Sequence, residues 1–190
     1  MIIICVALEV ELSDPKHQNY DMLYTGVGKV QAATKLAHKI GSYKHNNVTE
    51  VWNYGTAGGV NPSISGLTEI HEFTQRDMNA EPIEPRGNVP YSNPLLGNIK
   101  TSSFRNDRSF TNVRCGTGDN FVTSPDKWFT DENIDCVDME GYALAYVCQY
   151  YEIKFRSWKY ISDMANENAS KDWKINCDKG AESFKEIHVI

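Results

Sequence analysis

The sequence has no hydrophobic run long enough to cross a membrane. Its apolar opening, residues 2–7, is far shorter than the roughly 20 residues that a membrane helix needs. No basic residue precedes this stretch, although a secretory signal peptide begins with positive charge. We therefore expect neither an anchor nor a signal peptide here, no contact with a membrane, and a buried strand over residues 2–7.

Positive charge is also scarce. The 19 lysines and arginines are outnumbered by 25 aspartates and glutamates, which gives a net charge of −6 at pH 7. A surface that binds nucleic acid needs a basic patch or stripe. The composition therefore argues against a nucleic-acid partner.

The cysteines do not form a pattern that indicates disulfides or a metal site. They are odd in number and widely spaced, and no pair has the short spacing of a zinc site. The five are Cys5, Cys115, Cys136, Cys148 and Cys177. No cluster of histidines and cysteines offers a metal site either. We expect reduced thiols in a cytoplasmic protein, with no metal and no cofactor.

Internal repeats and low-complexity tracts are absent too. The 190 residues are 41% hydrophobic and 23% charged, which is typical of a soluble globular protein. A chain of this length can bury a core of its own. The sequence therefore predicts one domain over residues 1–190.

The stretch 136–163 contains two acids at informative places. Apolar residues recur at helical spacing after Glu140, which predicts a helix that begins near this residue. Residues 155–161 are rich in aromatic and β-branched residues and predict a strand that ends at Ser162 and Asp163. In an α/β fold with a mainly parallel sheet, such strand ends and helix starts line the ligand crevice. Alternatively, Glu140 only favours a helix N-terminus and Asp163 only starts a loop.

Three further segments combine glycines or acids with predicted strands. Residues 8–12 place Glu9 and Glu11 after the first strand, where they form either a solvated turn or part of a site. Gly26-Val27-Gly28-Lys29 precedes a predicted helix over 30–40, but it matches neither the phosphate loop of nucleotide hydrolases nor the dinucleotide fingerprint. Residues 55–60, after a strand over 51–54, predict a tight glycine turn.

These segments together resemble a known family. Asp138-Met139-Glu140, a helix and then Ile161-Ser162-Asp163 resemble the signature of the purine nucleoside phosphorylase and uridine phosphorylase superfamily. The closest resemblance is to its methylthioadenosine/S-adenosylhomocysteine nucleosidases, in a short variant. Gly55-Thr56-Ala57-Gly58-Gly59 and Gly118-Asp119-Asn120-Phe121 resemble two further family elements, in the family's order. The resemblance implies an α/β fold, with three α/β/α layers and a central mixed, partly barrel-like sheet.

The resemblance also implies an activity. The family hydrolyses the N-glycosidic bond of an adenine nucleoside, such as 5′-methylthioadenosine or S-adenosylhomocysteine, and releases the free base. It gives Asp163 the role of general acid on the purine and Glu11, rather than Glu9, the role of holding and deprotonating water. Glu140 would bind the ribose hydroxyls. The other substrate-binding residues that it implies are Met139, Phe121, Val122, Thr56, Ala57, Gly58, Ser162 and Trp173.

Two alternatives remain open at this point. A phosphorylase of the same fold would use phosphate instead of water, and phosphorylases place an arginine near loops that lack one here, at residues 11–17 and 55–59. Arg76 is the remaining candidate for a phosphate ligand, although we expect it to pair with Asp77. The second alternative is a nucleoside-binding module without turnover. Family members are dimers or larger rings, so the resemblance also implies a homodimer.

Overall fold

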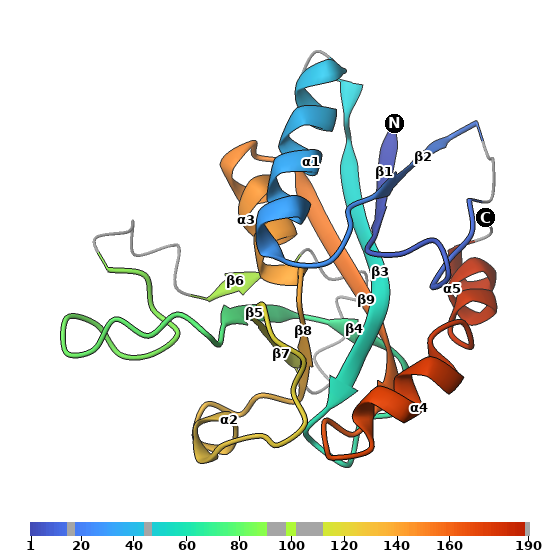
Figure 1. Ribbon diagram of the computed structural model, residues 1–190. Helices are drawn as coiled ribbons and strands as arrows, with labels where there is room; N and C mark the ends of the chain where they lie inside the picture. The colour runs from blue at the N-terminus through green and yellow to red at the C-terminus, as the bar shows by residue number, and fades with distance from the viewer. Residues whose placement is uncertain (15–17, 44–46, 91–97, 102–111, 189–190) are drawn as a thin grey trace.

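A nine-stranded mixed sheet forms the centre of the computed structural model, which describes residues 1–14, 18–43, 47–90, 98–101 and 112–188 (Figure 1). The strands are β1 Ile2–Val6, β2 Tyr20–Tyr24, β3 Glu50–Gly59, β4 Gly66–Ile70, β5 Glu72–Gln75, β6 Ile99–Lys100, β7 Arg114–Thr117, β8 Cys136–Asp138 and β9 Lys154–Asp163. The helices are α1 Lys29–Ser42, α2 Lys127–Asp131, α3 Gly141–Tyr150, α4 Ala169–Asn176 and α5 Ala181–His188. Within these described residues, no helix is long and apolar enough to span a bilayer.

The sheet branches at β3. Its main path runs in the order β2-β1-β3-β8-β7-β5-β6, while β9 pairs with both β3 and β4. The pairs β1–β2, β1–β3, β3–β9, β5–β7 and β7–β8 are parallel, and β3–β8, β4–β9 and β5–β6 are antiparallel. The mixed α/β architecture predicted from the sequence is confirmed. The expected barrel-like character is limited, because the sheet is not closed into a barrel.

Side chains of β1 alternate between two hydrophobic clusters, as expected for a strand with helices on both sides. Ile3 and Cys5 pack in the cluster that contains apolar residues of α1 and α3. Ile4 and Val6 pack in the other, with Phe184 of α5. Figure 1 shows α1 and α3 on one side of the sheet and α4 and α5 on the other. The predicted three-layer arrangement therefore follows from both faces of the sheet being apolar.

The glycine-rich residues after Tyr54 do not form the tight turn that the sequence predicted. They continue β3 as far as Gly59 and stay paired with β9. The register shifts at the end of this ladder: Ala57 pairs with Ile161, but Gly58 pairs with Asp163. Ser162 is therefore an extra residue on β9, and the irregularity is a β-bulge. Bulges turn neighbouring side chains toward the same side of a strand.

The segment 71–114 is described only in part, since residues 91–97 and 102–111 lie outside the described ranges. Its described residues form β5, β6 and a series of turns, and they contain no helix. The lack of a helix in these described residues agrees with the prolines of the segment, which disfavour long regular structure. The last helix, α5, covers residues 181–188.

Gly141 is a position at which the fold tolerates no side chain. A Cβ there would lie 2.1 Å from Cε1 of Phe73 and 2.7 Å from Oδ2 of Asp138. We expect Gly141→Ala to lower the free energy of unfolding by about 1–3 kcal/mol or more through overpacking. Gly41→Ala in α1 is the matched control, because a Cβ there meets nothing within 4 Å and alanine favours a helix. Urea denaturation of both variants measures the difference, and equal stability would contradict the packing argument.

Candidate active site

A cavity of about 310 Å³ lies where β1, β3, β8 and β9 end and α3 begins. Every residue predicted from the sequence to take part in the chemistry or to bind substrate lies on its wall. The lining residues are Ala7, Leu8, Glu11, Val27, Thr56, Ala57, Gly58, Arg76, Asn120, Phe121, Val122, Val137, Asp138, Met139, Glu140, Ser162, Asp163, Ser170, Trp173 and Lys174. Elements far apart in the sequence therefore share one site, although their roles in it stay predictions.

Glu11 lies in the turn after β1 and is buried, with 3% of its surface exposed. Its Oε2 accepts a hydrogen bond from the backbone N–H of Leu8 at 3.1 Å. Its Oε1 accepts two from Thr56, from the backbone N–H at 2.9 Å and from the hydroxyl at 2.7 Å. Glu9 is exposed and does not line the cavity. Of the two acids, only Glu11 is placed for chemistry in this cavity.

Asp163 reaches the cavity from the end of β9, next to the bulge. Its carboxylate accepts hydrogen bonds from the backbone N–H of Ala165 and the hydroxyl of Ser162, both at 2.9 Å. Burial nevertheless raises the pKa of Asp163 above its ordinary value, because desolvation disfavours the charged form more than these two donors favour it. A carboxyl group that keeps its proton to higher pH is suited to act as a general acid.

Glu140 precedes α3 and is also buried, with 7% of its surface exposed. Burial raises its pKa to about 7, and the nearby Asp138 carboxylate adds to this shift. The Lys159 ammonium and the backbone N–H of Gly28, which donates to Oε1 at 2.8 Å, act in the opposite direction. Glu140 thus holds the glycine loop before α1 against the cavity.

A buried ion pair beneath the cavity was not predicted from the sequence. Nζ of Lys159 lies 2.8 Å from Oδ2 of Asp138, and both side chains are 1% exposed. Asp138 also accepts hydrogen bonds from the Thr117 hydroxyl at 2.5 Å and the Gly141 N–H at 2.7 Å. Although burial acts against ionisation, the Lys159 charge holds the pKa of Asp138 below its ordinary value. A charged residue inside the aromatic strand 155–161 was the sequence signal for such a pair.

The predicted pairing of Arg76 with Asp77 is wrong. The Arg76 guanidinium, which is 3% exposed, donates to the carbonyls of Gly116 and Gly118 and to both oxygens of Asn120, at 2.6–3.1 Å. Asp77 pairs with Lys29 instead, at 2.5 Å. The carbonyls of the 116–120 segment point at Arg76, so they satisfy its donors better than one exposed carboxylate could. Arg76 therefore fixes the loop that precedes Phe121.

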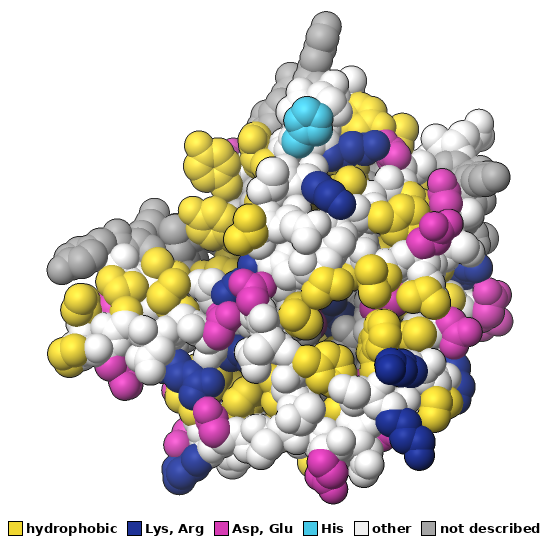
Figure 2. Space-filling model, in the orientation of Figure 1, with side chains coloured by type: hydrophobic (Ala, Val, Ile, Leu, Met, Phe, Trp, Pro, Cys, Tyr) yellow, Lys and Arg dark blue, Asp and Glu magenta, His cyan; other side chains and the backbone are white. Residues whose placement is uncertain are grey.

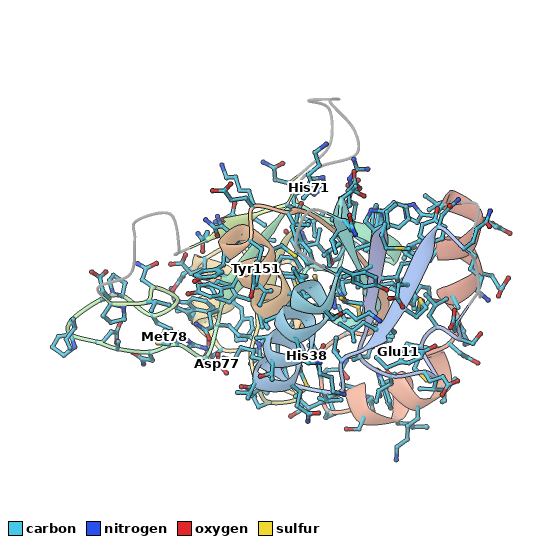
Figure 3. The ribbon with its side chains drawn as sticks, turned by 90° about the horizontal axis from the view of Figure 1, so that it is seen from above. Glu11, His38, His71, Asp77, Met78 and Tyr151 are labelled. Carbon is cyan, nitrogen blue, oxygen red and sulfur yellow. The ribbon has the colours of Figure 1, made fainter. Side chains whose placement is uncertain are left out.

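A second set of contacts ties this loop to the start of α1. The backbone N–H of Lys29 donates to Asp119 at 2.8 Å, and the Asp119 N–H donates to Asp77 at 2.9 Å. The Lys29 ammonium also donates to Gln75 at 2.9 Å. In Figure 3, Asp77 and Glu11 lie on opposite sides of α1. The glycine loop at residues 26–28 is therefore anchored both to Glu140 and to this surface network.

The two aromatic residues of the site differ in how they are held. Phe121 is 43% exposed at the cavity wall, with Val122 buried beside it. Trp173 comes from α4, and its indole N–H donates to the Thr56 hydroxyl at 2.9 Å.

Among the described residues, no group of three or more histidine, cysteine, aspartate or glutamate side chains could hold a metal ion.

Residues 22–189 match the model of a protein family described as the phosphorylase superfamily. The chain belongs to this superfamily. A 5′-methylthioadenosine/S-adenosylhomocysteine nucleosidase of Bacillus cereus (strain G9842) is 28% identical over 178 residues, which cover 84% of the chain and 74% of that protein.

Solved structures of other proteins share the fold of this superfamily member. Futalosine hydrolase of Helicobacter pylori strain 26695 is 22% identical, with a TM-score of 0.82, over 96% of this chain and 92% of that one. The Helicobacter pylori 5′-methylthioadenosine/S-adenosylhomocysteine nucleosidase is 23% identical, with a TM-score of 0.82, over 96% and 93% of the two chains. That structure contains a ligand with an amino-bearing pyrrolo[3,2-d]pyrimidine and a prop-2-yn-1-ylthio group.

Glu140 predicts a specific pH dependence of stability in this superfamily member. Its protonated form is favoured in the folded state, so its stabilising contribution is complete below its ordinary value of 4.5 and is lost as pH rises toward a folded pKa of about 7. We therefore expect the stability of the wild type relative to Glu140→Gln to fall as pH rises between about 4.5 and 7. Urea denaturation across this range measures it. If the difference in stability between the wild type and Glu140→Gln does not vary with pH, the pKa of Glu140 is not raised in the folded state.

Proposed function

We propose that this member of the phosphorylase superfamily is a nucleosidase. It hydrolyses the N-glycosidic bond of an adenine nucleoside such as 5′-methylthioadenosine or S-adenosylhomocysteine and releases the free base. The observation that carries this proposal is the convergence of Glu11, Glu140 and Asp163 on one cavity from three separate elements. A module that only binds nucleosides has no need for all three acids. The names of two of the similar proteins described above support the substrate class.

The proposed reaction gives each of the three acids a different role. Asp163 donates a proton to N7 of the purine, so the electron pair of the breaking C1′–N9 bond is taken up by the neutral base. Glu11 removes a proton from water while the water oxygen bonds to C1′. Glu140 accepts hydrogen bonds from the ribose hydroxyls and stabilises positive charge on the sugar. The proton that Glu11 gains returns to Asp163 through solvent, which completes the cycle.

Water is favoured over phosphate because the cavity offers little free positive charge. Arg76 and Lys174 are the cationic residues among those that line it. Four of the five Arg76 N–H donors point at protein oxygens, and Lys174 is an exposed residue of α4. A phosphate bound by Arg76 would have to displace the contacts that hold the 116–120 segment. This observation makes the phosphorylase the weaker alternative.

The proposal extends to the state of the protein in the cell. We propose that residues 1–190 act as one domain, in the cytoplasm and as a homodimer. Support for the dimer comes from four exposed hydrophobic residues on and next to α1 and α3, which pack side by side. They are Val27, Val30, Tyr146 and Tyr150, with 43%, 76%, 40% and 74% of their surface exposed. Figure 2 shows hydrophobic side chains gathered over α3, beside α1. Val27 also lines the cavity, so a partner seated here would lie next to the site.

The reaction is tested by incubating the protein with 5′-methylthioadenosine, with and without phosphate, and separating the products. We expect adenine and methylthioribose in equal amounts, and the same rate whether phosphate is present or not. Asp163→Asn should lower kcat by roughly 10²–10⁴-fold, the usual contribution of a general acid. Its melting temperature should stay close to that of the wild type.

Two results would contradict the proposal. Base release that requires phosphate and yields a sugar phosphate would establish the phosphorylase and make Arg76 the residue to vary. Tight nucleoside binding without any base release would establish the binding module.

The proposed dimer is tested by sedimentation velocity at micromolar concentration. We expect the wild type to sediment as a dimer and Tyr150→Glu to sediment as a monomer, because a buried unpaired charge is costly. Ile83→Glu is the matched control: Ile83 is 61% exposed and belongs to the segment between β5 and β6 rather than to α1 or α3, so this variant should remain a dimer. A monomeric wild type would exclude the dimer.

A further inference from the structure

The Thr56 hydroxyl lies between two other side chains of the site. It is 2.9 Å from Nε1 of Trp173 on one side and 2.7 Å from Oε1 of Glu11 on the other. Thr56 is on β3, Trp173 on α4 and Glu11 in the turn after β1. One hydroxyl group therefore connects three elements of the cavity wall.

The direction of both hydrogen bonds is fixed by chemistry. An indole nitrogen can only donate, so the Thr56 oxygen must accept from Trp173. An ionised carboxylate can only accept, so the single hydroxyl proton must point at Glu11. While both contacts hold, Thr56 has no proton to give to water or to a sugar hydroxyl. It can only accept one further hydrogen bond.

The two oxygens of Glu11 are consequently not equivalent. Oε1 accepts from both the backbone N–H and the hydroxyl of Thr56. Oε2 accepts only from the backbone N–H of Leu8. Each carboxylate oxygen has about two lone-pair positions, so those of Oε1 are filled and one position remains on Oε2.

We propose that Trp173, acting through Thr56, positions Glu11 so that Oε2 is the atom that takes the proton from water. This inference rests on the proposed function and adds to it the atom that acts as base and the two residues that select it. Trp173 and Thr56 are positioning residues in this scheme. The bond that forms is between Oε2 and the water proton, and the hydroxide equivalent attacks C1′ as described above.

Helix α4 also connects the proposed base, Glu11, with the proposed acid, Asp163. Nδ2 of Asn176, in the same helix as Trp173, donates to the carbonyl of Ser162 at 2.8 Å. Ser162 donates in turn to Asp163. Helix α4 is thereby attached at one point to the strand end that carries the acid and at another to the hydroxyl that contacts the base. Its position sets both groups together.

A double-mutant cycle tests the proposal. Trp173→Phe keeps an aromatic ring but removes the indole N–H, and Thr56→Val keeps the shape of the side chain but removes the hydroxyl. We expect Trp173→Phe to lower kcat about threefold to tenfold, the effect of one lost hydrogen bond, with KM changed by less than about twofold. In the Thr56→Val background the same change should lower kcat no further. In the Thr56→Ser background, which retains a hydroxyl, the full effect should return.

Other outcomes would overturn it. If Trp173→Phe lowers kcat equally with and without the Thr56 hydroxyl, Trp173 does not act through Thr56. If Trp173→Phe raises only KM, the role of Trp173 is confined to contact with the purine base of the substrate. Melting temperatures of all variants identify any loss that comes from misfolding.

A readout without turnover separates this inference from the proposed function. The indole N–H resonance of Trp173, assigned by its loss in Trp173→Phe, should shift in Thr56→Val, because the hydrogen bond is removed. An unchanged resonance would overturn the Trp173–Thr56 link even in an active enzyme. If the resonance shifts in Thr56→Val as expected but the wild type cleaves no purine nucleoside, the Trp173–Thr56 link stands, while the nucleosidase and with it the base role of Oε2 are refuted.

Discussion

The parallel pairing of β3 with β9 is the constraint on which the rest of the site depends. The ladder runs from Glu50 and Lys154 in continuous register and shifts only at its end, where Gly58 pairs with Asp163. Because the ladder is continuous, the ends of both strands lie side by side at the cavity. The bulge then brings Ser162 and Asp163 together to the cavity wall. The same β3 pairs with β1, which leads into the turn that carries Glu11.

The second constraint is the charge that this geometry buries. Four carboxyl groups line the cavity, those of Glu11, Asp138, Glu140 and Asp163, with one fully buried lysine beneath them. Asp138 has Lys159 at 2.8 Å, and Glu11 accepts three hydrogen bonds. Glu140 and Asp163 have weaker compensation, and burial raises the pKa of each. Acid–base chemistry at one pH requires environments that push the pKa values of carboxyl groups apart in this way.

The sequence predicted what depends on local pattern and missed what depends on tertiary contacts. Helical spacing was sufficient for α1 and α3, and apolar or aromatic and β-branched composition for β1 and β9. Resemblance to a family selected residues that the structure brings to one cavity. The glycine turn at 55–60 was wrong because small residues also suit a strand that borders a cavity. The Arg76–Asp77 pair was wrong because sequence neighbours need not be each other's best partners: the acceptors of Arg76 are about 40 residues away. The Lys159–Asp138 pair required knowing that β9 and β8 both border β3.

The extended, glycine-rich end of β3 also has a meaning for the entropy of binding. A Cβ on Gly58 would lie 2.9 Å from Oδ1 of Asp163, so this part of the wall must be main chain. Main chain held in a ladder has no rotamers to lose when a ligand arrives, whereas a wall of long side chains would lose about 0.5–1.5 kcal/mol for each one immobilised. The cavity is thus shaped before anything enters it. The cost of ordering this wall is met when the chain folds and not each time a ligand binds.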